Sequence, residues 1–366
     1  MKQKAAVFVI NSLQNGGAER VVVNQAIELD RRGIHVTIIM IHDLQFYRLP
    51  KTVETIVISK KTTGIRKILN IIRLANVLDL KLNQLNEKYD IVLMTANLPY
   101  THYICRFSKY YQKFMFVMHN PQYQFSYSRS VLFKKKMHFI YGKAHIVAVS
   151  EGVRDELVSV YGLNATKVVT IYNPFVFDEI SEKLSSYDDA PAKYKYILGV
   201  GRLGKEKRFD RLIRAFKEGK LFMEYKLVIL GIGDDEKRLK ELVRNLALDE
   251  YVIFIGWSND VYNWMKNANL FVCSSDYESF GMAIVEALYC NCPVVSVNSF
   301  GPKEILCGNL SKYLSENNVD DLAKKMVSAL EYYPPIEKSY FKRFDVKKIM
   351  NEYLEQYKRM VISENE

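Results

Sequence analysis

Short apolar segments of strand length alternate with helical segments along almost the whole chain. In the first half, the expected strands are residues 5–10, 35–41, 90–94, 114–118, 146–149 and 168–171. In the second half, they are residues 196–200, 226–230, 252–255, 270–273 and 294–297. Their apolar residues are continuous, which is typical of parallel sheets that helices cover on both faces. The pattern therefore predicts an α/β fold.

Helices are expected between these strands. The first runs from about residue 18 to residue 32, where Gly33 stops it. The others are expected from residue 63 or 64 to about 85, near 208–218, 235–247, 259–267, 280–290 and 318–331, and at about 346–360. Residues 174–191 are polar and bounded by prolines, which predicts an interdomain linker. We expect doubly wound domains at 1–173 and 192–345, with a ligand cleft between their facing strand ends.

Composition excludes several classes of protein. Hydrophobic residues make up 49% of the 366 and charged residues 25%, as in a folded protein and unlike a disordered chain. No apolar run approaches the roughly 18 residues that a membrane span needs, and Ala5–Ile10 is too short for a signal peptide. The expected location is the cytoplasm. The five cysteines lack metal-site spacing, so we expect them to be reduced and to bind no structural metal.

Charge is distributed unevenly along the chain. Residues 1–173 hold 24 basic and 11 acidic residues, a net charge of +13, whereas the remainder has a net charge of −2. This asymmetry favours an anionic partner for the first half, and nucleic acid, an anionic membrane surface and a phosphorylated substrate are the candidates. Ordinary solubility charge is the alternative.

Two glycine-rich loops follow expected strands. Gly16 and Gly17 come after the first strand and before a helix, where backbone N–H groups can approach a ligand. They do not form a G-x-G-x-x-G dinucleotide motif. Gly231 and Gly233 follow a strand of the second half in the same way. A plain tight turn would explain either loop equally well.

A basic loop opens the second domain. After the strand that ends at Val200, the sequence reads Gly-Arg-Leu-Gly-Lys-Glu-Lys, which places Arg202 and Lys207 beside the start of a helix. Two cations next to a helix N-terminus make an anion site, and a diphosphate is the natural occupant. The alternative is solvated surface charge.

Two carboxylates occur eight residues apart around the start of another helix. Glu278 precedes the helix, and Glu286 lies in the apolar run Met282–Leu288. A buried carboxylate needs hydrogen-bond donors, and ligand hydroxyls would serve. Such a pair could bind a sugar or perform acid/base chemistry. The alternative is a helix cap and a structural ion pair.

Taken together, these motifs resemble those of the retaining glycosyltransferases of family 4. They are NGGAER at 15–20, GRLGKEK at 201–207, the E-x7-E of ESFGMAIVEAL at 278–288, and GPKEIL at 301–306, and the resemblance covers nearly the whole chain. It implies the GT-B fold, in which two Rossmann-like domains face each other across a cleft. It also implies that the last helix, within 346–366, packs back on the N-terminal domain.

The resemblance also implies roles for individual residues in a site for a nucleotide-activated sugar, most often a UDP-sugar. Arg202 and Lys207 match the basic pair that holds the diphosphate, and Glu286 matches the carboxylate that binds ribose hydroxyls. The remaining matches are Glu278 for the donor sugar, the backbone of Phe280, Gly281 and Met282, the Gly16–Gly17 loop over the phosphates, and the active-site His119. We add Gly231 as a contact of the nucleotide-sugar donor, and we rank Glu19 and Glu304 below the other residues as site candidates. A lone histidine at a strand end is otherwise more often structural.

Charge build-up on the departing diphosphate can be stabilised by fixed cations and a helix dipole. No Asp-x-Asp motif occurs in the active segments, so we expect no cofactor and no metal requirement. Family resemblance implies retention at the anomeric carbon.

The acceptor is expected to be a polyprenyl-diphosphate-linked glycan or a surface polysaccharide, as the resemblance suggests. Basic and aromatic residues interleave in 106–114 and 133–141, which favours an anionic membrane surface over solvated helices or a nucleic-acid groove. We expect a peripheral protein on the inner face of the cytoplasmic membrane. The rival functions are a nucleotide-sugar 2-epimerase and a non-catalytic sugar-nucleotide-binding partner, and the intact motif set argues against both.

Overall fold

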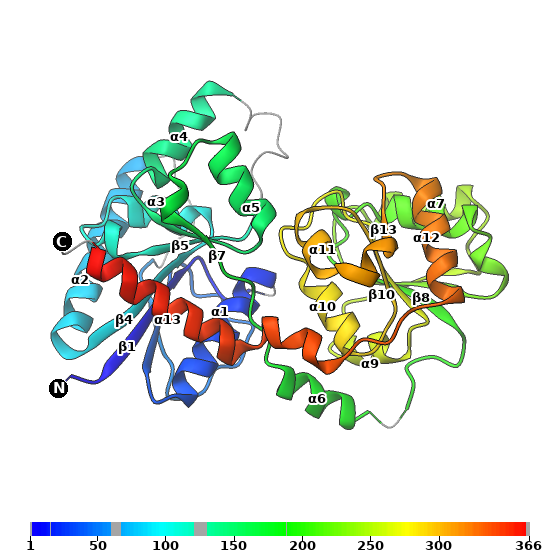
Figure 1. Cartoon of the computed structure of the whole chain (residues 1–366), viewed down its shortest axis with the longest axis horizontal. Coiled ribbons are helices and arrows are strands. Elements are labelled where there is room, and N and C mark those ends of the chain that lie inside the picture. The colour runs from blue at the N-terminus through cyan, green and yellow to red at the C-terminus, as the bar shows by residue number, and fades with distance from the viewer. Residues whose placement is uncertain (1, 15, 60–66, 121–129, 188, 364–366) are drawn as a thin grey trace. The chain divides into compact units, whose positions relative to one another are not determined.

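The chain forms two compact units in the computed structural model, which describes residues 2–14, 16–59, 67–120, 130–187 and 189–363 (Figure 1). Unit 1 comprises residues 1–176 together with 342–366, and unit 2 comprises residues 177–341. Within the described ranges, no helix is both long and apolar enough to cross a membrane.

Unit 1 is built on a parallel sheet in the order β3-β2-β1-β4-β5-β6-β7. The strands are β1 (Lys4–Ile10), β2 (His35–Met40), β3 (Glu54–Val57), β4 (Asp90–Asn97), β5 (Met115–Met118), β6 (His145–Ala148) and β7 (Val168–Thr170). The helices are α1 (Gly17–Arg31), α2 (Lys67–Lys88), α3 (Pro99–Arg106), α4 (Val131–Tyr141), α5 (Glu151–Asp155) and α13 (Val346–Ser363). The strand order reverses direction between β1 and β4, so the loops after these strands diverge there.

Unit 2 repeats this plan with the strand order β10-β9-β8-β11-β12-β13. Its strands are β8 (Tyr196–Val200), β9 (Lys226–Leu230), β10 (Val252–Gly256), β11 (Leu270–Cys273), β12 (Val294–Val297) and β13 (Leu314–Ser315). Its helices are α6 (Phe177–Ser185), α7 (Phe209–Glu218), α8 (Glu236–Asn245), α9 (Val261–Asn267), α10 (Met282–Tyr289), α11 (Phe300–Ile305) and α12 (Val319–Glu331). The reversal here lies between β8 and β11.

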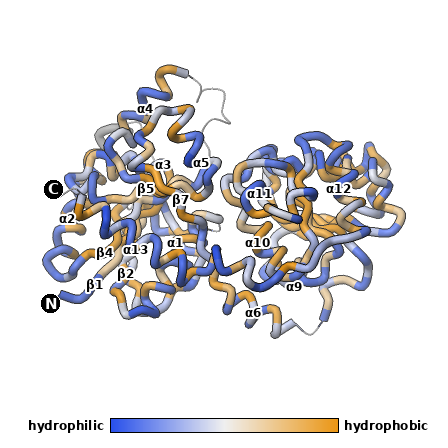
Figure 2. Tube along the Cα trace, in the orientation of Figure 1, coloured by the Kyte–Doolittle hydropathy of each residue, from blue (hydrophilic) through white to orange (hydrophobic). Residues whose placement is uncertain are grey.

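The expected parallel sheets are confirmed, since every pair of neighbouring strands runs parallel. Residues 5–10 of β1 are all buried, which explains why its apolar residues are continuous rather than alternate. Figure 2 shows the same hydrophobic interior along the strands of each unit. Helix α1 ends where predicted, because Gly33 adopts a left-handed φ of 74° and its N–H bonds to the carbonyl of Asp30.

The expected linker at 174–191 is different in the structure. It contains α6, which belongs to unit 2 and buries Phe177 and Ile180. The ring of Phe177 stacks on Tyr289 with 4.4 Å between centroids. A segment whose composition is polar thus still forms an amphipathic helix, because only one of its faces needs apolar side chains. The unit boundaries accordingly fall at 176 and 341 rather than at 173 and 345.

Helix α13 packs in unit 1 against α1 and β4. Arg32, at the end of α1, donates to Asn351 Oδ1 at 2.6 Å and to the carbonyl of Lys347 at 2.7 Å. Tyr353 and Tyr357 of α13 are buried. The C-terminal helix is therefore part of the first unit's core.

Candidate active site

Lys207 and Glu278 form an ion pair beside the strand reversal of unit 2. Lys207 ends the short 3-10 helix η5 (Lys205–Lys207) that follows β8, and Glu278 lies in the loop between β11 and α10. Lys207 Nζ donates to Glu278 Oε1 at 2.6 Å, and Ser275 Oγ donates to the same oxygen at 2.8 Å. The point where strand order reverses is where open α/β sheets bind ligands. The pair therefore stands where a charged ligand would be expected.

Burial and charge act in opposite directions on Lys207. Burial alone would lower its pKa, but the charge of Glu278 and its hydrogen bond outweigh that effect, and the pKa of Lys207 lies above its ordinary value. Burial, followed by the Glu278 carboxylate, raises the pKa of the neighbouring Cys273 thiol to about 11. At neutral pH Lys207 is thus a cation and the Cys273 thiol is neutral.

Two glycine-containing loops of unit 2 pack directly on one another. A Cβ on Gly231, whose φ is 145°, would lie 1.8 Å from the carbonyl oxygen of Gly201. The N–H of Leu203 bonds to the carbonyl of Ile232 at 2.9 Å. Glycine is thus required at 231 by the adjacent backbone. This contact explains Gly231 without a ligand, so its expected role as a donor contact stays a prediction.

The predicted backbone contacts lie at the start of α10. Gly281 has a left-handed φ of 103° and precedes the helix, which no side chain caps, while Phe280 is buried. Met282 is the first residue of the helix and is partly buried. A Cβ on Gly301 would lie 1.9 Å from the carbonyl oxygen of Phe280, so α11 approaches this turn at backbone distance. This close approach requires a residue without a Cβ, and the GPKEIL motif provides one in Gly301.

Glu286 lies one helical turn further along α10. It is partly buried and accepts a hydrogen bond from the Tyr262 hydroxyl of α9 at 3.2 Å. The expectation that this carboxylate needs a donor is met in part by a protein side chain. Glu304 lies near the end of α11 and is also partly buried.

Arg202 is placed differently from its predicted partner Lys207. Its side chain is 71% exposed, and Nη2 contacts Glu206 Oε1 at 2.5 Å. Lys207 instead pairs with Glu278, 71 residues further along the chain. The structure therefore assigns the two cations of the GRLGKEK motif to different carboxylates.

In unit 1, Gly16 and Gly17 lie at the start of α1, after the loop that follows β1. Gly16 is in extended conformation at the N-cap, its carbonyl accepts from the Tyr47 hydroxyl at 3.2 Å, and Gly17 is exposed. The carboxylate of Glu19 lies beside Gly16, where a Cβ on the glycine would be 2.3 Å from Glu19 Oε2. Burial raises the pKa of Glu19. Asn15, the first residue of the motif, lies outside the described residues.

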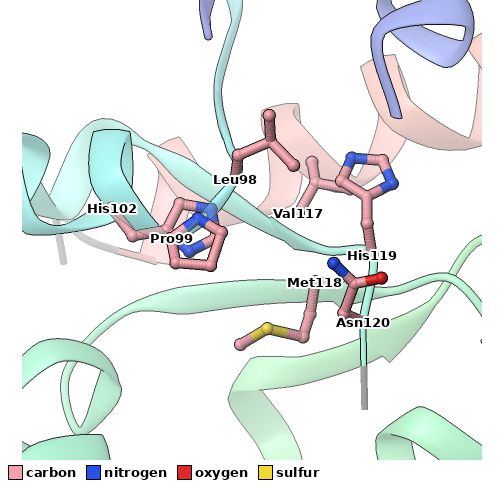
Figure 3. Close-up of a pocket in the computed structure, with 7 residues that line it drawn as sticks. All are labelled: Leu98, Pro99, His102, Val117, Met118, His119 and Asn120. Carbon is pink, nitrogen blue, oxygen red and sulfur yellow. The ribbon is translucent and has the colours of Figure 1, made fainter. Parts of the chain in front are cut away.

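His119 follows β5 and lines a small pocket that also includes residues of the loop after β4. Figure 3 shows its lining residues, which are Leu98, Pro99, His102, Val117, Met118, His119 and Asn120. Asn97 Nδ2 donates to Thr95 Oγ1, so Asn97 Oδ1 accepts from His119 Nε2–H at 3.1 Å. Burial, with a contribution from His102, lowers the pKa of His119 to about 3. His119 is therefore neutral at pH 7 and keeps Nδ1 as an acceptor.

His102 is the buried partner in this pocket. Its Nε2–H donates to the carbonyl of Ala96 at 2.9 Å, and its Nδ1 accepts from the Tyr141 hydroxyl at 2.9 Å. Burial, partly offset by the Ala96 hydrogen bond, lowers the pKa of His102 to about 4. Leu98 has a positive φ of 77°, which is strained for a residue with a Cβ.

Sequence reasoning missed Asn97, Tyr262 and Ser275 as partners of the predicted residues. Asn97 and Ser275 had one signal, because each is polar and stands at or just beyond the end of an apolar strand. Tyr262 had none, since its contact with Glu286 depends on how α9 packs against α10. Across the described residues, no group of three or more His, Cys, Asp or Glu side chains is arranged to hold a metal ion.

Both units match known family models. Residues 15–178 match the model described as Glycosyltransferase Family 4, and residues 181–341 match the one described as Glycosyl transferases group 1. A Campylobacter jejuni protein is 30% identical over 372 residues, which cover 96% of this chain and 98% of that protein. It is named N-acetylgalactosamine-N,N'-diacetylbacillosaminyl-diphospho-undecaprenol 4-alpha-N-acetylgalactosaminyltransferase.

Solved structures share the fold. The Anabaena protein Alr3699/HepE in complex with UDP superposes with a TM-score of 0.75 at 18% identity, over 97% of this chain and 100% of that one. WaaG, a glycosyltransferase involved in lipopolysaccharide biosynthesis, superposes with a TM-score of 0.61 at 17% identity, over 96% and 95% of the two chains. The two parallel-sheet units are those of the GT-B fold.

Proposed function

This chain belongs to the family 4 glycosyltransferases of GT-B fold, and on that premise we propose that it transfers a hexosyl or N-acetylhexosaminyl unit from a UDP-sugar to a lipid-linked glycan, with retention. The observation that carries the proposal is the Lys207–Glu278 pair at the strand reversal of unit 2, with Nζ and Oε1 2.6 Å apart. A protonated lysine just before the start of α7 suits a diphosphate, and a fixed carboxylate suits sugar hydroxyls.

Departure of the nucleotide builds negative charge on the diphosphate. A cation whose position is already fixed stabilises that charge without reorganisation, and this is usually the largest catalytic contribution. Lys207 meets the requirement, because Glu278 keeps it protonated and holds its Nζ in place. In the proposal, Lys207 contacts the diphosphate, Glu278 the donor sugar and Glu286 the ribose. Arg202 releases Glu206 and binds the diphosphate instead.

The protonation state of His119 limits its part in the reaction. A neutral ring that donates Nε2–H to Asn97 presents Nδ1 as an acceptor. We therefore assign to it a hydrogen bond from a sugar hydroxyl rather than stabilisation of the phosphate charge. No metal ion is required in this scheme, and activity is expected to be unchanged by EDTA.

The lipid-linked acceptor is supported by the Campylobacter jejuni relative, whose name specifies a diphospho-undecaprenol substrate and an alpha linkage. An α-linked product from an α-linked nucleotide sugar corresponds to retention. The basic first half of the chain suits a diphosphate-linked lipid in an anionic bilayer.

Helix α4 offers a surface for peripheral membrane binding. Val131 and Leu132 at its start are 70% and 78% exposed, and Lys134 and Lys135 follow on the exposed side. Each lysine near an anionic surface contributes about 1 kcal/mol, and exposed apolar side chains can insert among the headgroups. The arrangement suits a bilayer of anionic lipid, and Figure 2 shows hydrophobic and hydrophilic residues interleaved along this helix.

Flotation with liposomes tests this surface. The chain should float with vesicles that contain phosphatidylglycerol and remain below with pure phosphatidylcholine. Leu132→Ser should weaken binding, whereas Leu80→Ser, at an apolar residue that is 62% exposed on α2, should not. Equal binding of both variants would remove α4 from the proposed surface.

The activity itself is tested by UDP release from a panel of UDP-sugars, with UDP-N-acetylgalactosamine and UDP-N-acetylglucosamine first. Polyprenyl-diphosphate-linked saccharides are added or omitted, and the anomeric configuration of the product is read by NMR. Release that depends on acceptor, with an α-linked product, supports the proposal. A β-linked product would refute retention. Conversion of the UDP-sugar into its 2-epimer, without acceptor and without net release of UDP, would indicate an epimerase, and UDP binding without turnover would indicate a binding partner.

A further inference from the structure

Two arginines contact one aspartate in the segments that carry Lys207 and Glu278. Arg208 Nη1 lies 3.1 Å from both carboxylate oxygens of Asp276, and Arg211 Nη2 donates to Asp276 Oδ1. Arg211 is almost wholly buried and also donates from Nη1 to the carbonyl of Ser274 at 2.9 Å. We call Arg208, Arg211 and Asp276 the arginine clamp.

The clamp joins the two segments that carry the reactive pair. Arg208 directly follows Lys207, and Asp276 lies two residues before Glu278. The backbones are joined at the same place, since the N–H of Asp276 bonds to the carbonyl of Glu206 at 3.0 Å. Ser274 Oγ donates to the carbonyl of Lys207 at 2.9 Å. Movement of either segment would therefore change the separation of Lys207 and Glu278.

The backbone of Arg208 has a conformation that is unfavourable for a residue with a Cβ. It has φ 50° and ψ 41°, in the left-handed region, at the N-cap of α7. Glycine adopts this conformation without strain, whereas a residue with a Cβ does so at a cost. The guanidinium offsets that cost, because it also contacts both oxygens of Asp210, at 3.0 and 3.3 Å. A strained arginine held by two carboxylates is pre-organised to fix its neighbour.

We propose that the arginine clamp is a positioning device that holds Lys207 and Glu278 in register for the diphosphate and the donor sugar. Its catalytic consequence rests on the proposed function, but its effect on the pair does not. Asp276 and the two arginines act through Lys207 and Glu278 and need not touch the substrate themselves. Displacement of a reacting group by 1 Å can cost about 100-fold in rate.

Arg208→Gly is the informative variant. It keeps the left-handed backbone, removes the guanidinium and relieves strain, so the unit should remain folded with a Tm within about 3 °C of the parent. Arg208→Lys restores the positive charge but not the simultaneous contacts with two carboxylates, so it is expected to recover little of the positioning of Lys207. Asp276→Asn removes the shared acceptor charge from the other segment. Glu224→Gln is the control, because it breaks an equally short pair with Lys195 at 2.6 Å, beside the opposite ends of the strands.

The first readout needs no substrate. The acetylation rate of Lys207 by acetic anhydride is measured by mass spectrometry after digestion with a protease that does not cut at arginine. Arg208→Gly and Asp276→Asn should raise that rate at least threefold, and Glu224→Gln should leave it unchanged. An unchanged rate in both folded clamp variants would overturn the proposal.

The second readout is turnover. We expect kcat to fall about tenfold or more in Arg208→Gly, and the double variant with Asp276→Asn to be little worse than either single change. Faster acetylation with unaltered kcat and KM would overturn the catalytic role of the clamp. If the unsubstituted protein turned over no UDP-sugar, the proposed function would fail, and the acetylation rates alone would decide whether the clamp positions the pair.

Discussion

Acidification should destabilise unit 1 through His102. This ring is 1% exposed, and both of its nitrogens are engaged, one donating to Ala96 and the other accepting from Tyr141. Burial lowers its pKa to about 4, whereas an unfolded histidine titrates at about 6.5. Between these values, the unfolded chain binds a proton that the folded chain does not, so stability falls as pH decreases through that window. The shift of about 2.5 pH units corresponds to roughly 3 kcal/mol, lost progressively between about pH 6.5 and 4.

Hydrogen exchange read by mass spectrometry can assign this loss to unit 1. After correction for intrinsic rates, His102 should account for about two orders of magnitude of the protection that peptides from β4 and β5 lose between pH 7 and pH 4, and the lowered pKa of His119 in the same unit adds to that loss. Peptides from β8 and β11 of unit 2 provide the internal comparison, since His102 does not belong to their unit. A direct check is the titration of 13C-labelled histidine by NMR. A His102 resonance that titrated near pH 6.5, or β4 protection that stayed flat with pH, would refute the reasoning.

The functional counterpart concerns His119. Because burial lowers the pKa of His119 to about 3, its ring is neutral throughout the range in which the enzyme would be assayed. In the profile of kcat/KM against pH, no rise or fall between pH 5 and 8 should be due to His119. The variant His119→Asn should therefore keep the shape of the profile in that range. A rise or fall that disappeared in the variant would mean that His119 changes charge during catalysis, against the hydrogen-bonding role proposed for it.

Three further changes test the donor half. Gly231→Ala should lower the free energy of unfolding by more than about 2 kcal/mol, because its Cβ would lie 1.8 Å from the carbonyl oxygen of Gly201. The measurement is urea unfolding followed by tryptophan fluorescence, and a loss below about 0.5 kcal/mol would contradict the packing argument. Glu286→Gln should weaken UDP binding about tenfold in calorimetry but weaken 2′-deoxy-UDP much less, and equal losses would remove the carboxylate from the ribose. Glu206→Gln frees Arg202 and should strengthen UDP binding about threefold, whereas unchanged affinity would place Arg202 away from the diphosphate.

Much of the fold could be predicted because buried parallel strands leave a strong local signal. The five strands expected in the second half match β8 to β12 within a residue at each end, since each is a short run of β-branched and other apolar residues. The signal fails where burial is incomplete. Residues 54–57 form β3 at a sheet edge with an exposed start, and 177–185 form α6 within a polar stretch.

The candidate site was predictable in position but not in its pairings. Functional residues follow strands, and parallel strands deliver their following loops to one edge of a sheet, so Lys207 and Glu278 could be expected near each other. Their ion pair spans 71 residues and depends on the loop conformations, which no local pattern encodes. The same limit hid the exchange of partners by which Arg202 takes Glu206 instead.

A residue can have a positive φ for two different reasons, which the sequence alone does not distinguish. Gly231 is a glycine because the Gly201 backbone leaves no room for a Cβ, so its identity follows from packing whether or not a ligand is present. Arg208 has a different positive φ, 50°, in the left-handed helical region, where glycine would also be the less strained choice. The cost is accepted there because the guanidinium reaches two carboxylates. Lys220, Ala247 and Asn291 of unit 2 also have positive φ, so it is the contacts of the Arg208 guanidinium with Asp210 and Asp276, rather than its backbone alone, that point to the segment that carries Lys207.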